Sequence, residues 1–254
     1  MTYPIVWWVL LPIVDEWNFR RRGRSLWRGR PRQFFLITIP LSVLLWLLYE
    51  LLNLGSPQWR YRGGFQSIGG QVLFGFASFA TVIPIIVEAY WLFADSFCLP
   101  RVNANKWLLL AIGLAVLSTP AYNDVFWLNQ GMWLGPALLL LPFVEIAQCV
   151  SPRKLLLDLT LTGLVAGICW ECLNYWAPTH WEYLILPNVP HLFEMPLPGY
   201  IGFIPFALTV LVVYEWQLRL KPAIAAGAAL YGAALVLLYA LTVVYNERGL
   251  WVVS

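Results

Sequence analysis

The chain repeats one short stretch, and its second copy reads WECLNYWAPTHWEY from Trp170 to Tyr183. This copy closes a long apolar run and places Glu171 and Asn174 three residues apart. The two side chains share one face if the run is a helix. An acidic residue near the end of a membrane span is costly and marks a site by default. The stretch therefore predicts a membrane helix whose carboxyl group has a defined task.

Four residues of this stretch recur 121 or 122 residues earlier in the chain. The earlier residues are Glu50, Asn53, Trp59 and Tyr61, and their later counterparts are Glu171, Asn174, Trp181 and Tyr183. Pro84 and Pro205 are also 121 residues apart, and the segment 10–15 resembles the segment 140–145. We therefore interpret the chain as two repeats, residues 1–126 and 127–254, within one integrated membrane domain.

The composition excludes an ordinary soluble protein. Hydrophobic residues make up 60% of the chain and charged residues 11%, whereas soluble domains carry about 25% charged residues. The fifteen tryptophans and twelve tyrosines suit the aromatic belts at membrane interfaces. Seven arginines lie between residues 20 and 32. We interpret them as a cytoplasmic anchor on anionic lipid, and we expect no nucleic-acid partner.

The apolar runs predict eight transmembrane helices, four in each repeat, in an all-α polytopic protein. The expected spans are residues 3–14 with a continuation to about 19, 34–54, 72–93, 107–121, 132–148, 155–176, 198–216 and 223–245. With both termini outside, the cytoplasmic loops hold thirteen basic residues and the outer side holds three. This asymmetry follows the positive-inside rule. We expect the bacterial inner (plasma) membrane as the location.

The repeated acids are the main catalytic candidates. Glu50 and Glu171 are expected at similar depth near the outer leaflet, each with an asparagine, Asn53 or Asn174, that orients its carboxyl group. Partial burial would make one of them a proton donor and the other a base. The alternative is that both acids are structural and only tie helices together. Glu88 is a further candidate because it lies one turn after Pro84 inside a span.

The repeated aromatic residues are the candidates for substrate binding. Trp59, Tyr61, Trp181 and Tyr183 could stabilise a cation or stack on a flat apolar molecule, or they could be interfacial anchors. His180 and His191 belong to the loop after the sixth expected span and are assigned to the same binding role. Their spacing is not that of metal ligands, so we expect no metal and no cofactor.

Cys169 and Cys172 have the form Cys-x-x-Cys, which leaves open a redox role. Helix packing by two small side chains is the alternative for this pair.

The order of these features resembles a known family. Each repeat has a basic loop, an acid near a span end, a Trp-x-Tyr and then a proline in the next span. This order resembles the membrane carotenoid end-group enzymes, namely the duplicated lycopene cyclase domain and, more loosely, the carotenoid hydratases. The resemblance implies acids that protonate a terminal double bond without net redox change. The Pro-x-Glu-Glu motif of the cyclases is absent, since Pro84 is followed by an acid only at Glu88.

The sequence thus predicts a membrane enzyme of the cyclase, hydratase or isomerase type. Its partners would be membrane lipid and a long apolar isoprenoid-like or carotenoid-like substrate, and an oligomer is left open. A transporter with a polar site between parallel repeats is the second interpretation. A membrane assembly or scaffold protein is the third.

Overall fold

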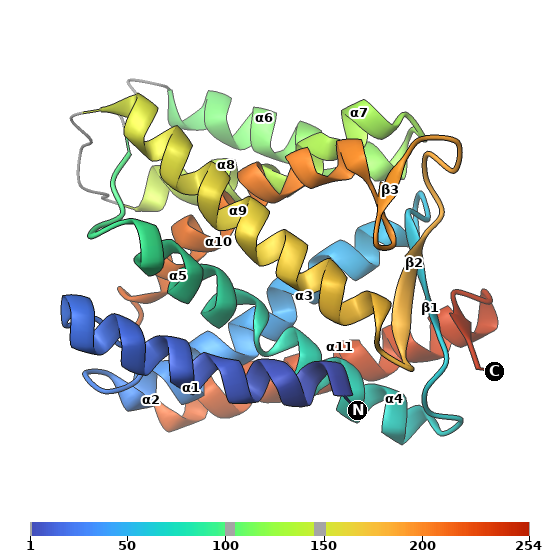
Figure 1. Ribbon diagram of the computed structural model, residues 1–254, viewed down its shortest axis with the longest axis horizontal. Helices are drawn as coiled ribbons and strands as arrows, with labels where there is room; N and C mark the ends of the chain where they lie inside the picture. The colour runs from blue at the N-terminus through green and yellow to red at the C-terminus, as the bar shows by residue number, and fades with distance from the viewer. Residues whose placement is uncertain (1, 100–104, 145–150, 254) are drawn as a thin grey trace.

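Helices form most of the structure, a computed structural model that describes residues 2–99, 105–144 and 151–253 (Figure 1). The α-helices are α1 (Thr2–Arg22), α2 (Pro31–Gln33), α3 (Ile39–Asn53), α4 (Ile68–Phe79), α5 (Val82–Phe93), α6 (Lys106–Leu117), α7 (Phe126–Asn129), α8 (Gly135–Leu140), α9 (Pro152–Tyr175), α10 (Phe203–Gln217) and α11 (Ile224–Glu247). The π-helical turn η1 (Phe34–Thr38) joins α2 to α3. The 3-10 turns are η2 (Thr119–Ala121), η3 (Gln130–Trp133), η4 (Leu141–Phe143) and η5 (Leu197–Gly202).

Five helical segments are long and apolar enough to cross a membrane. They are Pro31–Asn53, Ile68–Phe93, Pro152–Tyr175, Leu197–Gln217 and Ile224–Glu247. These segments correspond to the second, third, sixth, seventh and eighth of the expected spans. The expectation of an all-α membrane protein is therefore confirmed at this level.

The other three expected spans have no helix of this kind within the described residues. Helix α1 has 21 residues but ends in three arginines. Helix α6 has 12 residues and extends over about 18 Å, short of the roughly 30 Å of a hydrocarbon core. The fifth expected span is divided into η3, α8 and η4, with Pro136 and Pro142 at the starts of α8 and η4. Its last residues, Glu145 to Gln148, lie outside the described part of the chain.

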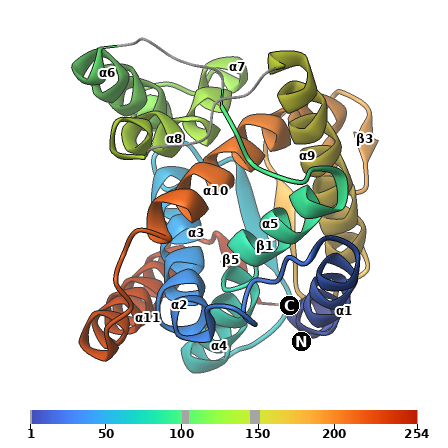
Figure 2. The same ribbon diagram turned by 90° about the vertical axis from the view of Figure 1, so that its left-hand side faces the viewer.

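Successive elements alternate in direction along the long axis of the molecule (Figure 1). Helices α1, α5 and α10 run one way, and α3, α9 and α11 run the other way. Viewed along this axis, α6, α7 and α8 are grouped at one edge and α4 and α11 at the opposite edge (Figure 2). Helices α3 and α9, which hold the two repeated acids, therefore point in the same direction.

Helix α3 supports a break between α4 and α5. The Ser42 hydroxyl donates to Phe79 O at 2.6 Å and accepts from the Ile83 N–H at 3.0 Å. These bonds satisfy backbone groups that the interrupted helix leaves free. Gly163 of α9 is the counterpart of Ser42, and a Cβ there would lie 2.6 Å from Phe203 O. The glycine is required because α9 meets the start of α10 at backbone contact.

Short strands cover the end of the bundle where α3 and α9 finish. Strand β1 (Trp59–Arg62) pairs antiparallel with β2 (His180–Tyr183) and parallel with β5 (Trp251–Val252). Strands β3 (His191–Leu192) and β4 (Met195–Pro196) form a separate pair. The register sets Trp59 opposite Tyr183 and Tyr61 opposite Trp181. Trp59 and Trp181 thus each lie opposite a tyrosine of the other strand.

An aromatic core lies beneath the strands, with Trp46 of α3 at its centre. Its ring lies 5.9–6.4 Å from the ring centroids of Tyr49, Trp59, Phe79, Trp133, Trp170 and Phe206. These rings come from both repeats and bury large apolar areas. The core therefore holds the two halves together below the strand pair.

Membrane orientation is the first testable feature. The basic residues predict a cytoplasmic arginine loop, and Arg22 bonds to Asp95, so residues near 95 lie on the same side. Cys98 is disulfide-bonded, however, and disulfides form in oxidising compartments. The two observations favour opposite orientations.

We expect the orientation that the basic residues predict, with the arginine loop in the cytoplasm, because the asymmetry of basic residues sets the orientation during insertion. In a C169A/C172A variant, a cysteine at the exposed Asn188 should react with an impermeant maleimide on intact cells, and one at the exposed Gly29 should not. Permeabilised cells are the control for reactivity. Labelling at Gly29 alone would reverse the orientation.

Candidate functional site

Glu50 lies at the end of α3 and is enclosed by hydrogen-bond donors. Its Oε1 accepts from Trp46 Nε1 at 2.6 Å and from the Tyr61 hydroxyl at 2.5 Å. Its Oε2 accepts from Trp59 Nε1 at 3.2 Å and from the Tyr245 hydroxyl. A carboxylate with four donors is strongly stabilised. Glu50 is therefore a structural acid that ties α3, β1 and α11 together.

Glu171 occupies the equivalent position on α9 but has different surroundings. Its Oε1 accepts from the Tyr183 hydroxyl at 2.8 Å, and that hydroxyl accepts from Trp181 Nε1 at 3.2 Å. Its Oε2 is buried and has no hydrogen-bond partner among the described residues. Such an oxygen loses hydration without compensation. Glu171 is therefore the acid of the repeat that keeps a free oxygen.

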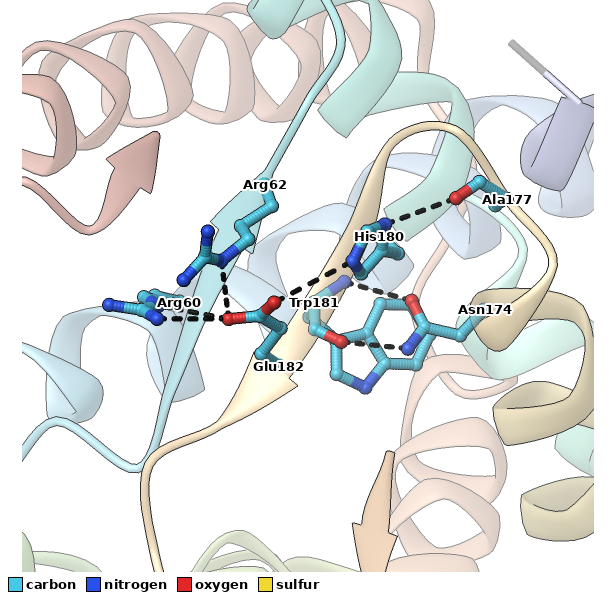
Figure 3. A network of polar contacts seen from close by, with 7 residues as sticks. All are labelled: Arg60, Arg62, Asn174, Ala177, His180, Trp181 and Glu182. Carbon is cyan, nitrogen blue, oxygen red and sulfur yellow. Dashed lines mark hydrogen bonds and ion pairs between the residues drawn. The ribbon is translucent and has the colours of Figure 1, made fainter. Parts of the chain in front are cut away.

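The repeated asparagines hold the strands, and within the described residues neither forms a direct hydrogen bond to its acid. Asn53 Nδ2 donates to Trp59 O at 2.9 Å, and Asn53 Oδ1 accepts from Gln58 N and Trp59 N. Asn174 Nδ2 donates to Trp181 O at 2.9 Å and Oδ1 accepts from Trp181 N at 2.9 Å (Figure 3). Each asparagine thus fixes the peptide of its tryptophan, and the carboxyl groups are oriented by tyrosine.

The outward face of the strand pair is charged. Arg60 and Arg62 both bond to Glu182 Oε2, at 3.1 and 2.5 Å (Figure 3). Burial alone would raise the pKa of Glu182, but the hydrogen bonds and charges of the two arginines outweigh it and hold that pKa below its usual value. His180 Nε2 lies 3.8 Å from Glu182 Oε1. The arginines thus pair with Glu182, which leaves the repeated acids to the aromatic face.

The tyrosines on the inward face remain protonated. Burial raises the pKa of Tyr61 and of Tyr183 well above the usual tyrosine value, and the adjacent Glu50 or Glu171 raises each further. Both phenols therefore serve as hydrogen-bond donors at any physiological pH.

Two cavities lie beneath the strands and share the side chains of Trp46, Tyr183 and Phe203. The Glu171 cavity has about 520 Å³ of empty space, and its lining includes Tyr3, Phe74, Trp170, Glu171 and Trp181. The Trp133 cavity has about 470 Å³, and its lining includes Gln58, Trp59, Trp133, Gly199 and Phe206. Aromatic side chains make up much of both linings.

The repeat relates the two cavities to each other. Tyr61 and Trp181 line the first, and their counterparts Tyr183 and Trp59 line the second. Glu171 reaches its cavity, but Glu50 does not line the other one, because Trp46 and Trp59 cover its carboxyl group. Glu50 borders a separate hollow together with Leu238 and Trp251, so the two acids face different spaces.

The remaining candidates are dispersed. His180 lines the Glu171 cavity, whereas His191 is exposed on β3 and lines neither cavity. Glu88 lies in a separate groove with Cys169. Cys169 and Cys172 are free thiols, and no cluster of three or more metal-ligating side chains occurs among the residues that the structure describes.

Sequence reasoning missed three residues of the site. Trp46 precedes Glu50 by four residues, a spacing that brings side chains together on a helix and could have identified it. Tyr245 reaches Glu50 across 195 residues, and Tyr3 reaches the Glu171 cavity from the N-terminal helix. No local pattern signals these two contacts.

The fold and its buried carboxyl groups define a polytopic α-helical membrane protein with an aromatic cavity around one free acid. Comparison with protein-family models, with curated proteins and with solved structures finds no match. The site's chemistry is therefore argued from its own residues.

The unequal bonding of the two acids predicts unequal effects of the same change. Glu50→Gln replaces an acceptor oxygen with an amide NH2 group, which cannot accept the hydrogen bonds that are directed at it. The change should therefore cost about 2–3 kcal/mol of stability. Glu171→Gln should cost less than about 1 kcal/mol, because the new amide NH2 group can take the position of an oxygen that has no hydrogen-bond partner among the described residues. Thermal unfolding in detergent measures both variants. An equal fall in melting temperature would contradict the assignment of Glu50 as the structural acid.

Proposed function

We propose that the protein is a membrane enzyme that protonates a carbon–carbon double bond of a long apolar isoprenoid, with Glu171 as the proton donor. The observation that supports this most is the free Oε2 of Glu171, buried in an aromatic cavity. A carboxyl group in such a place is most stable when neutral. It is then a general acid held against apolar surface.

The proposed reaction uses one proton and no redox partner. The π electrons of the double bond take the proton from Glu171, and a cation develops on the neighbouring carbon. The ring faces of Trp170 and Trp181, which line the cavity, would stabilise this cation. Loss of a proton from an adjacent carbon then returns a proton to the Glu171 carboxylate, giving an isomer or a ring. Addition of water before proton loss gives a hydrated product.

The role proposed for each residue follows from its contacts. Tyr183 orients the donor through its bond to Oε1, and Asn174 fixes the strand that carries the flanking tryptophan. The sequence predicts that one of the two acids is the donor and the other the base, but the four donors around Glu50 already occupy its two carboxyl oxygens. We therefore assign both proton transfers to Glu171.

The number and arrangement of the membrane-crossing elements belong to the same proposal. We propose eight crossing elements in two parallel repeats, with both termini outside the inner membrane. The alternating helix directions (Figure 1) and the reciprocal strand register support it. The short elements α6 and α8, which pack on each other, would cross only part of the bilayer.

A transporter is the second candidate. It is favoured by the position of Glu171 in one of two cavities that the repeat relates and that share three side chains. Sites between repeats are typical of transporters. The aromatic lining of both cavities favours the enzyme, since an aqueous permeation path would need polar groups.

Solvent-proton incorporation tests the proposed chemistry without knowledge of the product. Wild-type protein incubated in D2O with lycopene, as an acyclic polyene probe, should introduce deuterium at the terminal isoprene unit. Glu171→Gln should lower this rate by about 100-fold or more, the usual contribution of general acid catalysis. Mass spectrometry of the recovered polyene measures the label.

Glu50→Gln is the matched control, because it alters the other copy of the acid. Its rate per folded molecule should remain near that of the wild type. Undiminished labelling by the Glu171→Gln variant, or no labelling by the wild type with any acyclic polyene, would refute the proposal.

A further inference from the structure

A second buried polar site lies away from both cavities, where α1 packs against α5. It consists of Asp15, Asn18 and Glu88, whose exposed fractions are 1%, 0% and 1%. The function proposed above uses none of these residues. Three polar side chains buried at a helix contact are costly unless their hydrogen bonds are satisfied.

Asn18 and Glu88 are joined by two hydrogen bonds, and within the described part of the chain one oxygen of each side chain has no hydrogen-bond partner. Asn18 Nδ2 donates to Glu88 O at 3.0 Å and to Glu88 Oε2 at 2.6 Å. These bonds fix which end of the amide is nitrogen. Glu88 Oε1 and Asn18 Oδ1 are buried and have no partner among the described residues. The two unpaired acceptors thus belong to a pair of side chains already in contact.

One proton supplies the missing donor. An ionised Glu88 would leave its Oε1 and the amide oxygen of Asn18 both without a donor. A protonated Glu88 adds one O–H donor to this pair of side chains, and a donor is what the two unpaired oxygens lack. A cation such as Na⁺ would need more oxygen ligands than these two unpaired atoms. The geometry therefore fits a proton.

The neighbouring charges favour the same state. Asp15 accepts from Ser25 Oγ at 2.9 Å and from Leu26 N at 2.7 Å, so both of its oxygens already have a donor. Asp15 interacts electrostatically with Glu88, so two negative charges there would repel.

The groups on the other helices do not offset this repulsion. Tyr214 of α10 is close enough to be affected by the charge of Glu88, but it is a phenol and carries no positive charge. The carboxylate of α9, Asp158, is paired with Lys154 at 2.6 Å. No ion pair to Glu88 forms within residues 2–99, 105–144 and 151–253.

Asp15 connects this site to the arginine loop. Its two donors, Ser25 and Leu26, line a hollow of about 1040 Å³ that also contains Arg24, Arg30 and Glu215. On its other side, Glu88 borders an apolar groove of about 550 Å³ between α1, α5 and α9. Protons can therefore reach Glu88 from the polar hollow, and the apolar groove offers them no hydrated exit.

We propose that Asp15, Asn18 and Glu88 form a proton-binding site in which Glu88 holds the proton and Asp15 exchanges it with the hollow at the arginine loop. The transfer moves one proton from water to the Glu88 carboxylate through Asp15 and needs no other reactant. The contact between α1 and α5 then contains one bound proton, on the Glu88 carboxyl group. It is independent of the chemistry at Glu171.

Infrared spectroscopy of the full-length protein in detergent at neutral pH tests the protonation state. The carbonyl band of a protonated carboxylic acid should lose one component in Glu88→Gln, and that component should persist in Glu171→Gln and Glu50→Gln. Asn18→Ala should shift it, because the acid loses its hydrogen-bond partner. A band unchanged by Glu88→Gln would overturn the proposal. Loss of the component on addition of NaCl at constant pH would also overturn it, by identifying Na⁺ as the occupant.

Thermal unfolding gives an independent measurement. Glu88→Gln should keep or raise the melting temperature, since its amide N–H₂ supplies the donor that the proton supplies in the wild type. Glu88→Ala should lower it, because Asn18 loses both side-chain partners. A fall in Glu88→Gln as large as that in Glu88→Ala would contradict a protonated Glu88.

Exchange kinetics test the route. On transfer to D2O, the Glu88 component should shift more slowly in Asp15→Asn than in the wild type, by roughly tenfold or more. Ser25→Ala, which removes only a hydroxyl group at the edge of the hollow, should slow it in the same direction. Exchange at the wild-type rate in both variants would refute the role of Asp15.

Discussion

The cost of burying a carboxyl group in an apolar interior constrains this structure more than any other interaction. Two acids end the parallel helices α3 and α9, where both are buried and neither forms an ion pair within the described residues. Uncharged donors, the phenols and indoles of β1 and β2, form hydrogen bonds to these carboxyl groups. These donors are in place only because each strand is fixed by an asparagine one turn beyond its acid. The strand pair, the helix ends and the aromatic core therefore depend on one another.

The surroundings of Glu50 and Glu171 differ in a way that explains their unequal bonding. Glu50 gains donors from Trp46 and from Tyr245, which Glu171 does not have. The residue of α9 that corresponds to Trp46 is Gly167, where a Cβ would lie 2.5 Å from the Phe203 ring. Phe203 thus takes the space that an indole fills in the first repeat, and it offers no hydrogen bond. Glu50 is thus enclosed by four donors, whereas Glu171 has one oxygen without a hydrogen-bond partner among the described residues.

Two carboxyl groups with unpartnered oxygens result, Glu171 beneath the strands and Glu88 toward the arginine loop. The contact between Trp7 and Trp170, with ring centroids 6.2 Å apart, lies between their surroundings. Trp7 lines the groove of Glu88, and Trp170 lines the cavity of Glu171. The indoles keep the two regions separate, so each acid responds to its own neighbours.

The sequence by itself determined the membrane class, five of the spans and the repeated residues of the site. These features depend on composition and on short spacings, which apolar length and helix geometry translate directly into structure. The acid, tyrosine and tryptophan of each copy do meet, as their repetition indicated. Spacing could not show that the asparagines hold the strands, because a helix face places them near their acids equally well.

Only the tertiary structure decided which acid is free. The donors that enclose Glu50 include Tyr245, which is distant in the chain, and the space beside Glu171 is set by Phe203 of another helix. Burial and hydrogen-bond satisfaction are properties of the packed interior, so a local pattern repeated twice cannot reveal that its two copies differ. The same reason applies to Asn18 and Glu88, whose contact joins α1 to α5 across 70 residues.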